Sequence, residues 1–119
     1  MILNFVFTAP SAPTNIRTLE ISSTHAIITW KAPEFPNGII HSYTILLRGI
    51  AGDLILNMST TDMESNITDL SPFIEYQVFV FAETVETGES ANISFKTSEA
   101  SKLTHVCSTL FNKYIRFYP

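Results

Sequence analysis

The strongest structural signal in the chain is the stretch His25-Ala26-Ile27-Ile28-Thr29-Trp30-Lys31-Ala32-Pro33. Branched and aromatic side chains favour a pleated strand, because their stiff or flat shapes pack well on a sheet surface. The proline carries no backbone N–H and therefore ends the strand. Trp30 is the one tryptophan of the chain and is large enough to be packed by two sheets at once. The stretch therefore predicts a β-strand, with Trp30 as the buried anchor between two packed sheets.

The composition of the whole chain extends this preference for strands. Among 119 residues, 33 are isoleucine, valine or threonine, and 12% are aromatic. A hydrophobic share of 45% and a charged share of 15% exclude a disordered chain and a coiled coil. The length suits one domain with a sizeable core. No run approaches the roughly 18 uninterrupted apolar residues that a bilayer-spanning helix needs.

Short alternating runs follow one another from Thr14 onward, separated by turn residues at intervals of about 8–12 residues. We expect seven strands, at residues 14–21, 25–31, 40–48, 54–57, 65–68, 75–84 and 91–96. Gly88 is expected to mark the last turn. Cys107 is the only cysteine, so this all-β sandwich has no internal disulfide and no cysteine-based zinc site.

Several groups of residues between about positions 10 and 98 have the order and spacing of one known family. They are Pro10 and Pro13 before Asn15-Ile16, Ile28-Thr29-Trp30 before Ala32-Pro33, Pro36-Asn37-Gly38 before Ile40, Tyr43 and Ile45, Leu70-Ser71-Pro72 before Tyr76, and Gly88, Ser90 and Lys96-Thr97. Together they resemble a fibronectin type III domain. The resemblance implies a seven-stranded, immunoglobulin-like sandwich with a Greek-key path, usually one repeat of a tandem array. The stretch Pro36-Asn37-Gly38-Ile39-Ile40 looks like repeats of receptor-type tyrosine phosphatase and usherin-like ectodomains.

The same resemblance assigns structural roles and domain limits. Leu70 and Tyr76 resemble a tyrosine corner, in which the phenol bonds backward to the backbone. These two residues and Trp30 are expected to be structural. We expect the domain at residues 10–100. Residues 1–9 are then a linker or the end of a preceding repeat, and residues 101–119 a basic tail outside the domain.

Catalytic and ligand-binding patterns are missing from the sequence. His25, His41 and His105 have no metal-ligand partner three or four residues away. There is no glycine-rich phosphate loop and no nucleophile elbow. We therefore predict no catalytic, cofactor-binding or metal-binding residue, and no small-molecule substrate. Residues 10–100 carry 11 acidic and four basic side chains, a net charge of −7, which argues against nucleic-acid binding.

Three Asn-x-Ser/Thr motifs are candidate N-glycosylation sites: Asn57-Met58-Ser59, Asn66-Ile67-Thr68 and Asn92-Ile93-Ser94. Ile67 and Ile93 are predicted to face the core, which turns Asn66 and Asn92 toward solvent. The alternative is that the motifs are ordinary polar positions without a glycan.

A candidate interface follows from two neighbouring strands. Phe79 and Phe81 occupy outward positions of the sixth strand, where such domains usually carry polar residues, and Leu46 and Arg48 point outward from the third. If these strands pair, Leu46, Phe79 and Phe81 form one exposed apolar cluster, rimmed by Arg48, Lys96 and Glu83, and Arg48 is the fourth interface candidate. The cluster either binds a protein partner or is covered by a neighbouring repeat, a linker or the tail.

The tail at residues 101–119 repeats apolar side chains at helical spacing, with Lys102, His105, Lys113 and Arg116 off that stripe. Such a segment can make weak contact with an anionic membrane surface. Its many poor helix formers favour a disordered or isoform-specific end instead.

The sequence thus predicts an extracellular or cell-surface module of a multidomain receptor or adhesion glycoprotein. Its partners would be another protein or neighbouring fibronectin type III repeats. The alternative is a cytoplasmic structural module of the muscle giant-protein type, which would lack disulfides equally. The three glycosylation motifs favour the extracellular interpretation.

Overall fold

The alternating apolar runs form seven β-strands in the computed structural model, which describes residues 9–99. The strands are β1 (Thr14–Ile21), β2 (Ala26–Lys31), β3 (Ser42–Gly49), β4 (Leu54–Thr60), β5 (Glu64–Ile67), β6 (Glu75–Glu83) and β7 (Thr87–Lys96). The expected preceding-repeat segment, apart from residue 9, and the expected tail lie outside the described residues.

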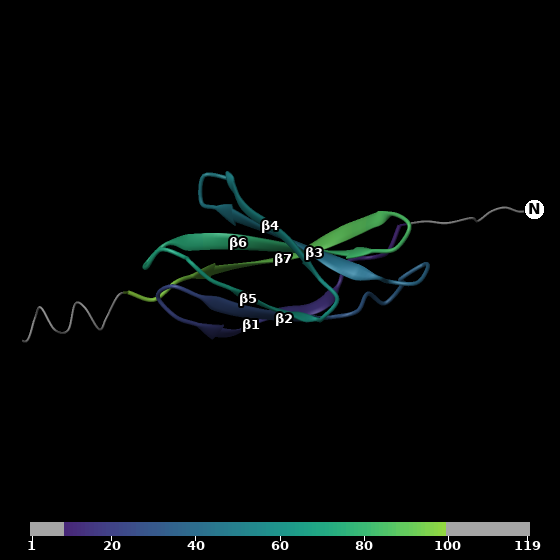
Figure 1. Ribbon diagram of the computed structural model, residues 1–119, viewed down its shortest axis with the longest axis horizontal. Helices are drawn as coiled ribbons and strands as arrows, with labels where there is room; N and C mark the ends of the chain where they lie inside the picture. The colour runs from purple at the N-terminus through teal and green to yellow at the C-terminus, as the bar shows by residue number, and fades with distance from the viewer. Residues whose placement is uncertain (1–8, 100–119) are drawn as a thin grey trace, which may run out of the picture.

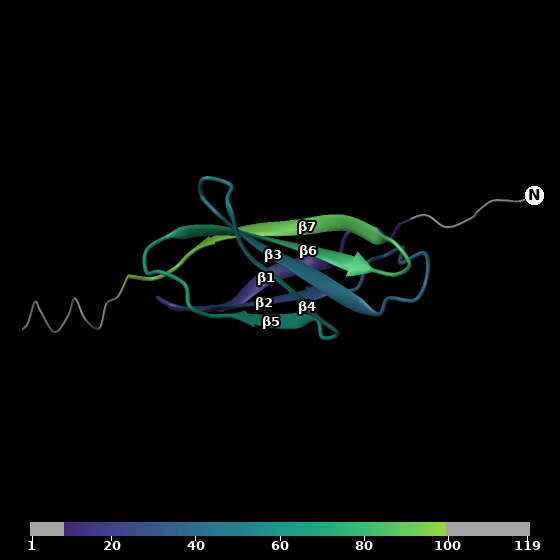
Figure 2. The same cartoon turned by 45° about the horizontal axis from the view of Figure 1, so that its top comes forward.

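The strands make two antiparallel sheets that form the two layers of a sandwich (Figure 1). One sheet has the order β1-β2-β5, and the other has the order β4-β3-β6-β7. Because β2–β3, β4–β5 and β5–β6 each cross between the sheets, the chain follows a Greek-key path. Figure 2 shows the edge strands β7 and β5 on opposite sides of the sandwich. The predicted all-β sandwich is confirmed.

The core lies between the sheets and is built by strict alternation along β2, β3 and β6. Its buried hydrophobic members are Ala26, Ile28, Trp30, Tyr43, Ile45, Leu47, Ile67, Leu70, Tyr76, Val78, Val80, Ala82 and Phe95. Trp30 is 3% exposed and meets the Tyr43 ring edge-on, with the ring centroids 5.6 Å apart. Burial raises the pKa of Tyr43 above 10.0, because the phenolate would lose its hydration.

Six of the seven expected strands differ from the structure at one or both ends, and two of them, β4 and β7, differ by three or more residues. β4 continues to Thr60 instead of ending at residue 57, because it pairs with β3 as far as Tyr43. β7 begins at Thr87 instead of residue 91, so Gly88 lies within the strand. The reason for a glycine there is close packing, since a Cβ atom at Gly88 would lie 2.5 Å from the carbonyl oxygen of Pro10.

The crossing from β5 to β6 is closed by hydrogen bonds to the backbone. The Ser71 backbone N–H donates to the Tyr76 hydroxyl oxygen over 2.9 Å, which is the geometry of a tyrosine corner. Leu70 is buried beside it, and its N–H donates to the Thr24 carbonyl oxygen at 2.9 Å. The Thr97 hydroxyl then donates to the Ser71 carbonyl oxygen at 2.7 Å. These bonds fasten the strand ends where the described chain leaves the sandwich.

Candidate interaction surface

The outer face of the four-stranded sheet brings the four predicted interface residues together. Strand pairing places Leu46 directly opposite Phe79 and Thr44 opposite Phe81. Arg48 follows on the same face of β3, and its guanidinium lies 5.9 Å from the centre of the Phe79 ring. We call Leu46, Phe79, Phe81 and Arg48 the outer cluster. The third and sixth strands are neighbours, as the sequence predicts, so the four residues lie on one face of the sheet.

Two polar groups define the edges of the outer cluster. Arg48 donates through Nη1 to the Gly52 carbonyl oxygen at 3.0 Å, which anchors the cation beside Phe79. At the other edge the Glu83 carboxylate accepts hydrogen bonds from the hydroxyls of Thr44 and Thr87, both at 2.7 Å. Both edges are therefore fixed by contacts within the domain.

Lys96 does not belong to this rim, contrary to the sequence prediction. In the β6–β7 register it lies opposite Glu75, at the start of β6. Its Nζ lies 3.9 Å from the centre of the Phe73 ring. The exposed apolar cluster that the sequence predicts is also less exposed than expected. Leu46, Phe79 and Phe81 are half-buried, and the Arg48 guanidinium lies over the Phe79 ring.

Two of the three candidate glycosylation sites border the outer cluster. Asn57 on β4 lies opposite Leu46, and Asn92 on β7 lies opposite Phe79. The third, Asn66, lies on β5 opposite Ile27, on the outer face of the other sheet. All three asparagine side chains are exposed.

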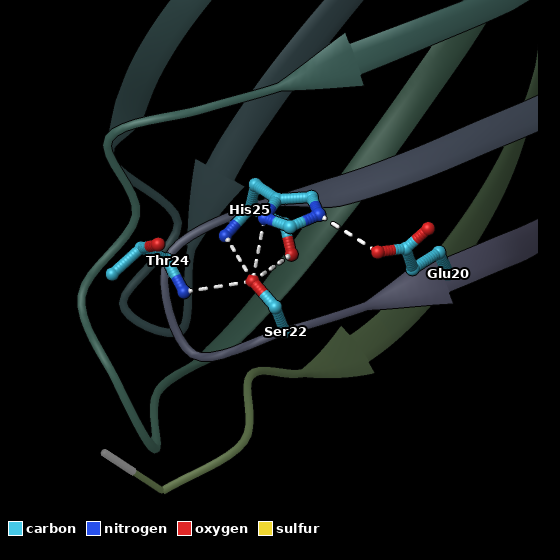
Figure 3. Close-up of polar contacts among 4 residues, drawn as sticks. All are labelled: Glu20, Ser22, Thr24 and His25. Atoms are coloured by element: carbon cyan, nitrogen blue, oxygen red, sulfur yellow. Dashed lines mark hydrogen bonds and ion pairs between the residues drawn. The ribbon is translucent and has the colours of Figure 1, made fainter. Parts of the chain in front are cut away.

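A serine, a histidine and a carboxylate are in contact at the β1–β2 turn (Figure 3). The Ser22 hydroxyl oxygen lies 2.6 Å from His25 Nδ1, and His25 Nε2 lies 3.1 Å from a Glu20 carboxylate oxygen. The same hydroxyl oxygen accepts the backbone N–H groups of Thr24 and His25 at 3.2 and 3.0 Å. These contacts satisfy the turn's own backbone donors, so the cluster stabilises the hairpin.

We next consider metal-binding groups, membrane-spanning helices and the remaining histidine among the described residues. Between residues 9 and 99, no group of three or more histidine, cysteine, aspartate or glutamate side chains could hold a metal ion. No helix in that part of the chain is long and apolar enough to cross a membrane. His41, the other histidine of this part, contacts the Thr84 carbonyl oxygen through Nε2 at 2.7 Å and ties the β2–β3 loop to the β6–β7 turn.

A family model described as "Fibronectin type III domain" matches residues 11–96. The chain belongs to the fibronectin type III family. The fold is shared with the rat CD45 extracellular region, since the chain superposes on part of its domains d3–d4 with a TM-score of 0.71. That likeness covers 76% of this chain and 51% of the CD45 chain at 16% identity, so it concerns the fold alone.

Curated relatives of this fibronectin type III domain are large proteins. It is 38% identical over 91 residues to human phosphatidylinositol phosphatase PTPRQ, covering 75% of the chain and 4% of that protein. It is 34% identical over 91 residues to the cell adhesion molecule Dscam2 of Drosophila melanogaster, covering 71% of the chain and 4% of that protein. Human usherin is 28% identical over 96 residues, covering 73% of the chain and 2% of that protein. The predicted resemblance to phosphatase and usherin repeats is confirmed.

The domain's most exposed apolar side chains lie in loops at its two ends, and the sequence analysis missed them. Ile39 and Val85 are 87% and 80% exposed in the β2–β3 and β6–β7 connections, where the described chain enters. Ile50 is 78% exposed in the β3–β4 turn at the other end. In the sequence, Ile39 and Ile50 each follow a glycine, and Val85 lies in a short turn. These positions do not indicate on their own whether the side chain is buried.

The segment before β1 is fastened to the β2–β3 loop. Ser11 donates its N–H to the Phe35 carbonyl oxygen at 2.9 Å, and the Ser11 hydroxyl accepts the Phe35 N–H at 3.0 Å. Asn37 Nδ2 donates to the Ala9 carbonyl oxygen at 3.0 Å. A groove of about 520 Å³ lies here, lined by Ala9, Pro10, Ser11, Phe35, Asn37 and Glu89. The linker residues are thus part of the domain's end surface.

Proposed function

We propose that this domain is an extracellular, non-catalytic interaction and spacer module of a multidomain cell-surface receptor or adhesion protein. The observation that carries the proposal is the family membership together with the size of the relatives. The domain corresponds to 4% of PTPRQ and 4% of Dscam2, as one repeat among many domains would. In this proposal any catalytic activity belongs to other domains of the whole protein.

The spacer role is supported by how the chain enters and leaves. The segment before β1 and the segment after β7 depart from opposite ends of the sandwich (Figure 1). Both segments are held by hydrogen bonds, through Ser11 and Asn37 at one end and Thr97 at the other. A neighbouring repeat would therefore be carried in line with the domain, against the exposed side chains of Ile39 and Val85 or of Ile50.

We place the domain at residues 10–100, with residues 1–9 and 101–119 outside it. Pro10 is fully buried against β7, which supports counting it with the domain although the family match starts at residue 11. The role of the basic tail, including contact with an anionic membrane, stays a prediction.

The interaction role has a second surface in the outer cluster. Aromatic and arginine side chains contribute interface energy out of proportion to their number, and Phe79, Phe81 and Arg48 lie together there. Where no glycan covers the outer cluster, a protein partner is therefore the second kind of contact that the module makes, beside its neighbouring repeats.

The test of the extracellular role is site-resolved mass spectrometry of the full chain secreted from mammalian cells behind a heterologous signal sequence. We expect a glycan on at least one of Asn57, Asn66 and Asn92. A protein without glycan at all three asparagines would contradict the proposal and support the cytoplasmic structural alternative.

A further inference from the structure

One row of side chains crosses the outer face of the four-stranded sheet from edge to edge. Asn57 on β4 lies opposite Leu46 on β3, Leu46 opposite Phe79 on β6, and Phe79 opposite Asn92 on β7. Directly opposite residues have Cβ atoms about 4.5–5.5 Å apart, so each asparagine is next to one apolar side chain. Both glycosylation motifs of this sheet therefore flank the Leu46–Phe79 pair.

We propose that N-linked glycans on Asn57 and Asn92 pack over this pair, with the first sugar at Asn92 lying on the Phe79 ring. The proposal rests on the extracellular location proposed above. In this proposal the module's own glycans cover the outer cluster.

The attachment chemistry fits the exposed groups of the row. A bond forms between asparagine Nδ2 and C1 of the first N-acetylglucosamine, while the bond from C1 to a diphosphate-linked lipid donor breaks. The lipid diphosphate leaves with the electron pair, and the amide gives up one proton. Asn92 accepts a weak hydrogen bond from Gln77 through Oδ1, at 3.4 Å, so that bond does not use Nδ2. Ser59 and Ser94, which complete the two motifs, are exposed like their asparagines.

The packing chemistry fits the pair between the asparagines. A pyranose ring presents C–H groups on its faces, and its N-acetyl group ends in a methyl. Packing such a surface against an aromatic ring or a leucine is favourable, because apolar area of both partners is removed from water. Phe79 and Leu46 are half-buried, so the part of each side chain that stays accessible suits a shallow cover such as a sugar.

A second copy of the domain is a poorer occupant of the same face. Residues 10–100 carry a net charge of −7, from 11 acidic and four basic side chains, so two copies repel each other. Glycans on both sides of the pair would also hold another flat sheet away from it.

Asn66 offers a matched control on the other sheet. Its row runs from Asn66 on β5 to Ile27 on β2 and Glu20 on β1, without an aromatic ring. A glycan at Asn66 should therefore stand free of the domain, and its removal should leave stability almost unchanged.

The experiment uses the full chain secreted from mammalian cells, with glycans trimmed enzymatically to the first sugar. Ser94→Ala removes the Asn92 glycan without changing the asparagine, and Thr68→Ala does the same for Asn66. We expect Ser94→Ala to raise the unfolding equilibrium constant about fivefold and Thr68→Ala to change it little. The same Ser94→Ala change in unglycosylated bacterial protein controls for the lost hydroxyl and should leave the constant unchanged.

Two further measurements test whether the stability effect of Ser94→Ala depends on the Phe79 ring. In a Phe79→Leu background, which keeps apolar bulk in the strand, the effect of Ser94→Ala should disappear. NMR should also show Overhauser effects between Phe79 ring protons and the first sugar on Asn92, which do not depend on any variant folding.

Four outcomes overturn the inference, and they separate it from the proposed function. A glycan on Asn92 with no Overhauser effect to Phe79, or with a stability effect that persists in Phe79→Leu, refutes the packing while the extracellular role stands. A glycan on Asn66 with bare Asn57 and Asn92 does the same, and leaves the outer cluster open to a protein partner. Bare asparagines at all three sites would overturn both proposals.

Discussion

On the inner face of the four-stranded sheet, Ile45 and Leu47 of β3 and Val80 of β6 are buried completely or almost completely. On the outer face, the residues between them, Leu46 and Phe79, are only half-covered and lie beside two glycosylation motifs. The same strands thus present two surfaces with different chemistry. Side chains one position apart along a strand point to opposite faces, so the two surfaces can vary independently.

The two faces affect different properties: the inner face determines the stability of the domain, and the outer face determines what it contacts. The inner face is mostly apolar and is packed by the other sheet, so its buried side chains contribute to the free energy of unfolding. The outer face carries a mixture of apolar, hydroxyl and amide side chains. Its residues therefore contact a glycan or a partner outside the domain more than they stabilise the core. Substitutions on the two faces should therefore have effects of different size and kind.

Trp30→Ala should cause the largest loss of stability on the inner side. The side chain is 3% exposed and packs against Tyr43. Removing a large aromatic group from a packed core costs about 3–5 kcal/mol of unfolding free energy. Denaturant unfolding measures the loss, with Trp30→Phe as the milder control. A loss below about a quarter of this range would mean that Trp30 does not anchor the sandwich.

Gly88→Ala tests whether inner packing extends beyond the sheets to the linker. The new Cβ atom would lie 2.5 Å from the Pro10 carbonyl oxygen and 2.9 Å from the Pro10 Cβ. Overpacking of this kind costs about 1–3 kcal/mol, because one segment must move. Thermal unfolding measures the cost, and Glu89→Ala at the exposed neighbouring position should be nearly neutral. An unchanged Gly88→Ala protein would show that Pro10 is not fastened to β7.

Tyr76→Phe should have a smaller effect, confined to the crossing between the sheets. The ring stays in the core, but the Ser71 N–H loses its acceptor. We expect a loss of about 1–2 kcal/mol and faster hydrogen exchange at the Ser71 amide. Ser71→Ala keeps the backbone N–H and should leave both stability and exchange nearly unchanged. Equal exchange rates at position 71 in wild type and Tyr76→Phe would contradict a tyrosine corner.

The inner face could be predicted from the sequence because its alternation is local. Tyr76, Val78, Val80 and Ala82 repeat at period two, and one alternation is enough to assign a face. That the third and sixth strands are neighbours followed from the family's strand order, whereas the register that places Leu46 opposite Phe79 comes from the structure. Sequence reasoning therefore identified the fold and the members of the outer cluster.

The surroundings of the outer cluster could not be predicted in the same way. Asn57 lies beside Leu46 only through the β3–β4 register, which is irregular between Leu47 and Arg48. A one-residue slip there would turn Asn57 to the inner face. Lys96 was misplaced on the rim for a related reason, since its neighbour Phe73 comes from a loop with no alternation to follow.

The most direct test of the difference between the faces compares two adjacent leucines of β3. Leu47 is 1% exposed on the inner face, whereas Leu46 is half-buried on the outer face. In unglycosylated protein, Leu47→Ala should lower the unfolding free energy by about 2–5 kcal/mol, and Leu46→Ala by less than about 1 kcal/mol. Denaturant unfolding of the two variants measures both values under identical conditions. Equal losses for Leu46→Ala and Leu47→Ala would contradict the account, because the outer face would then hold the fold as firmly as the inner one.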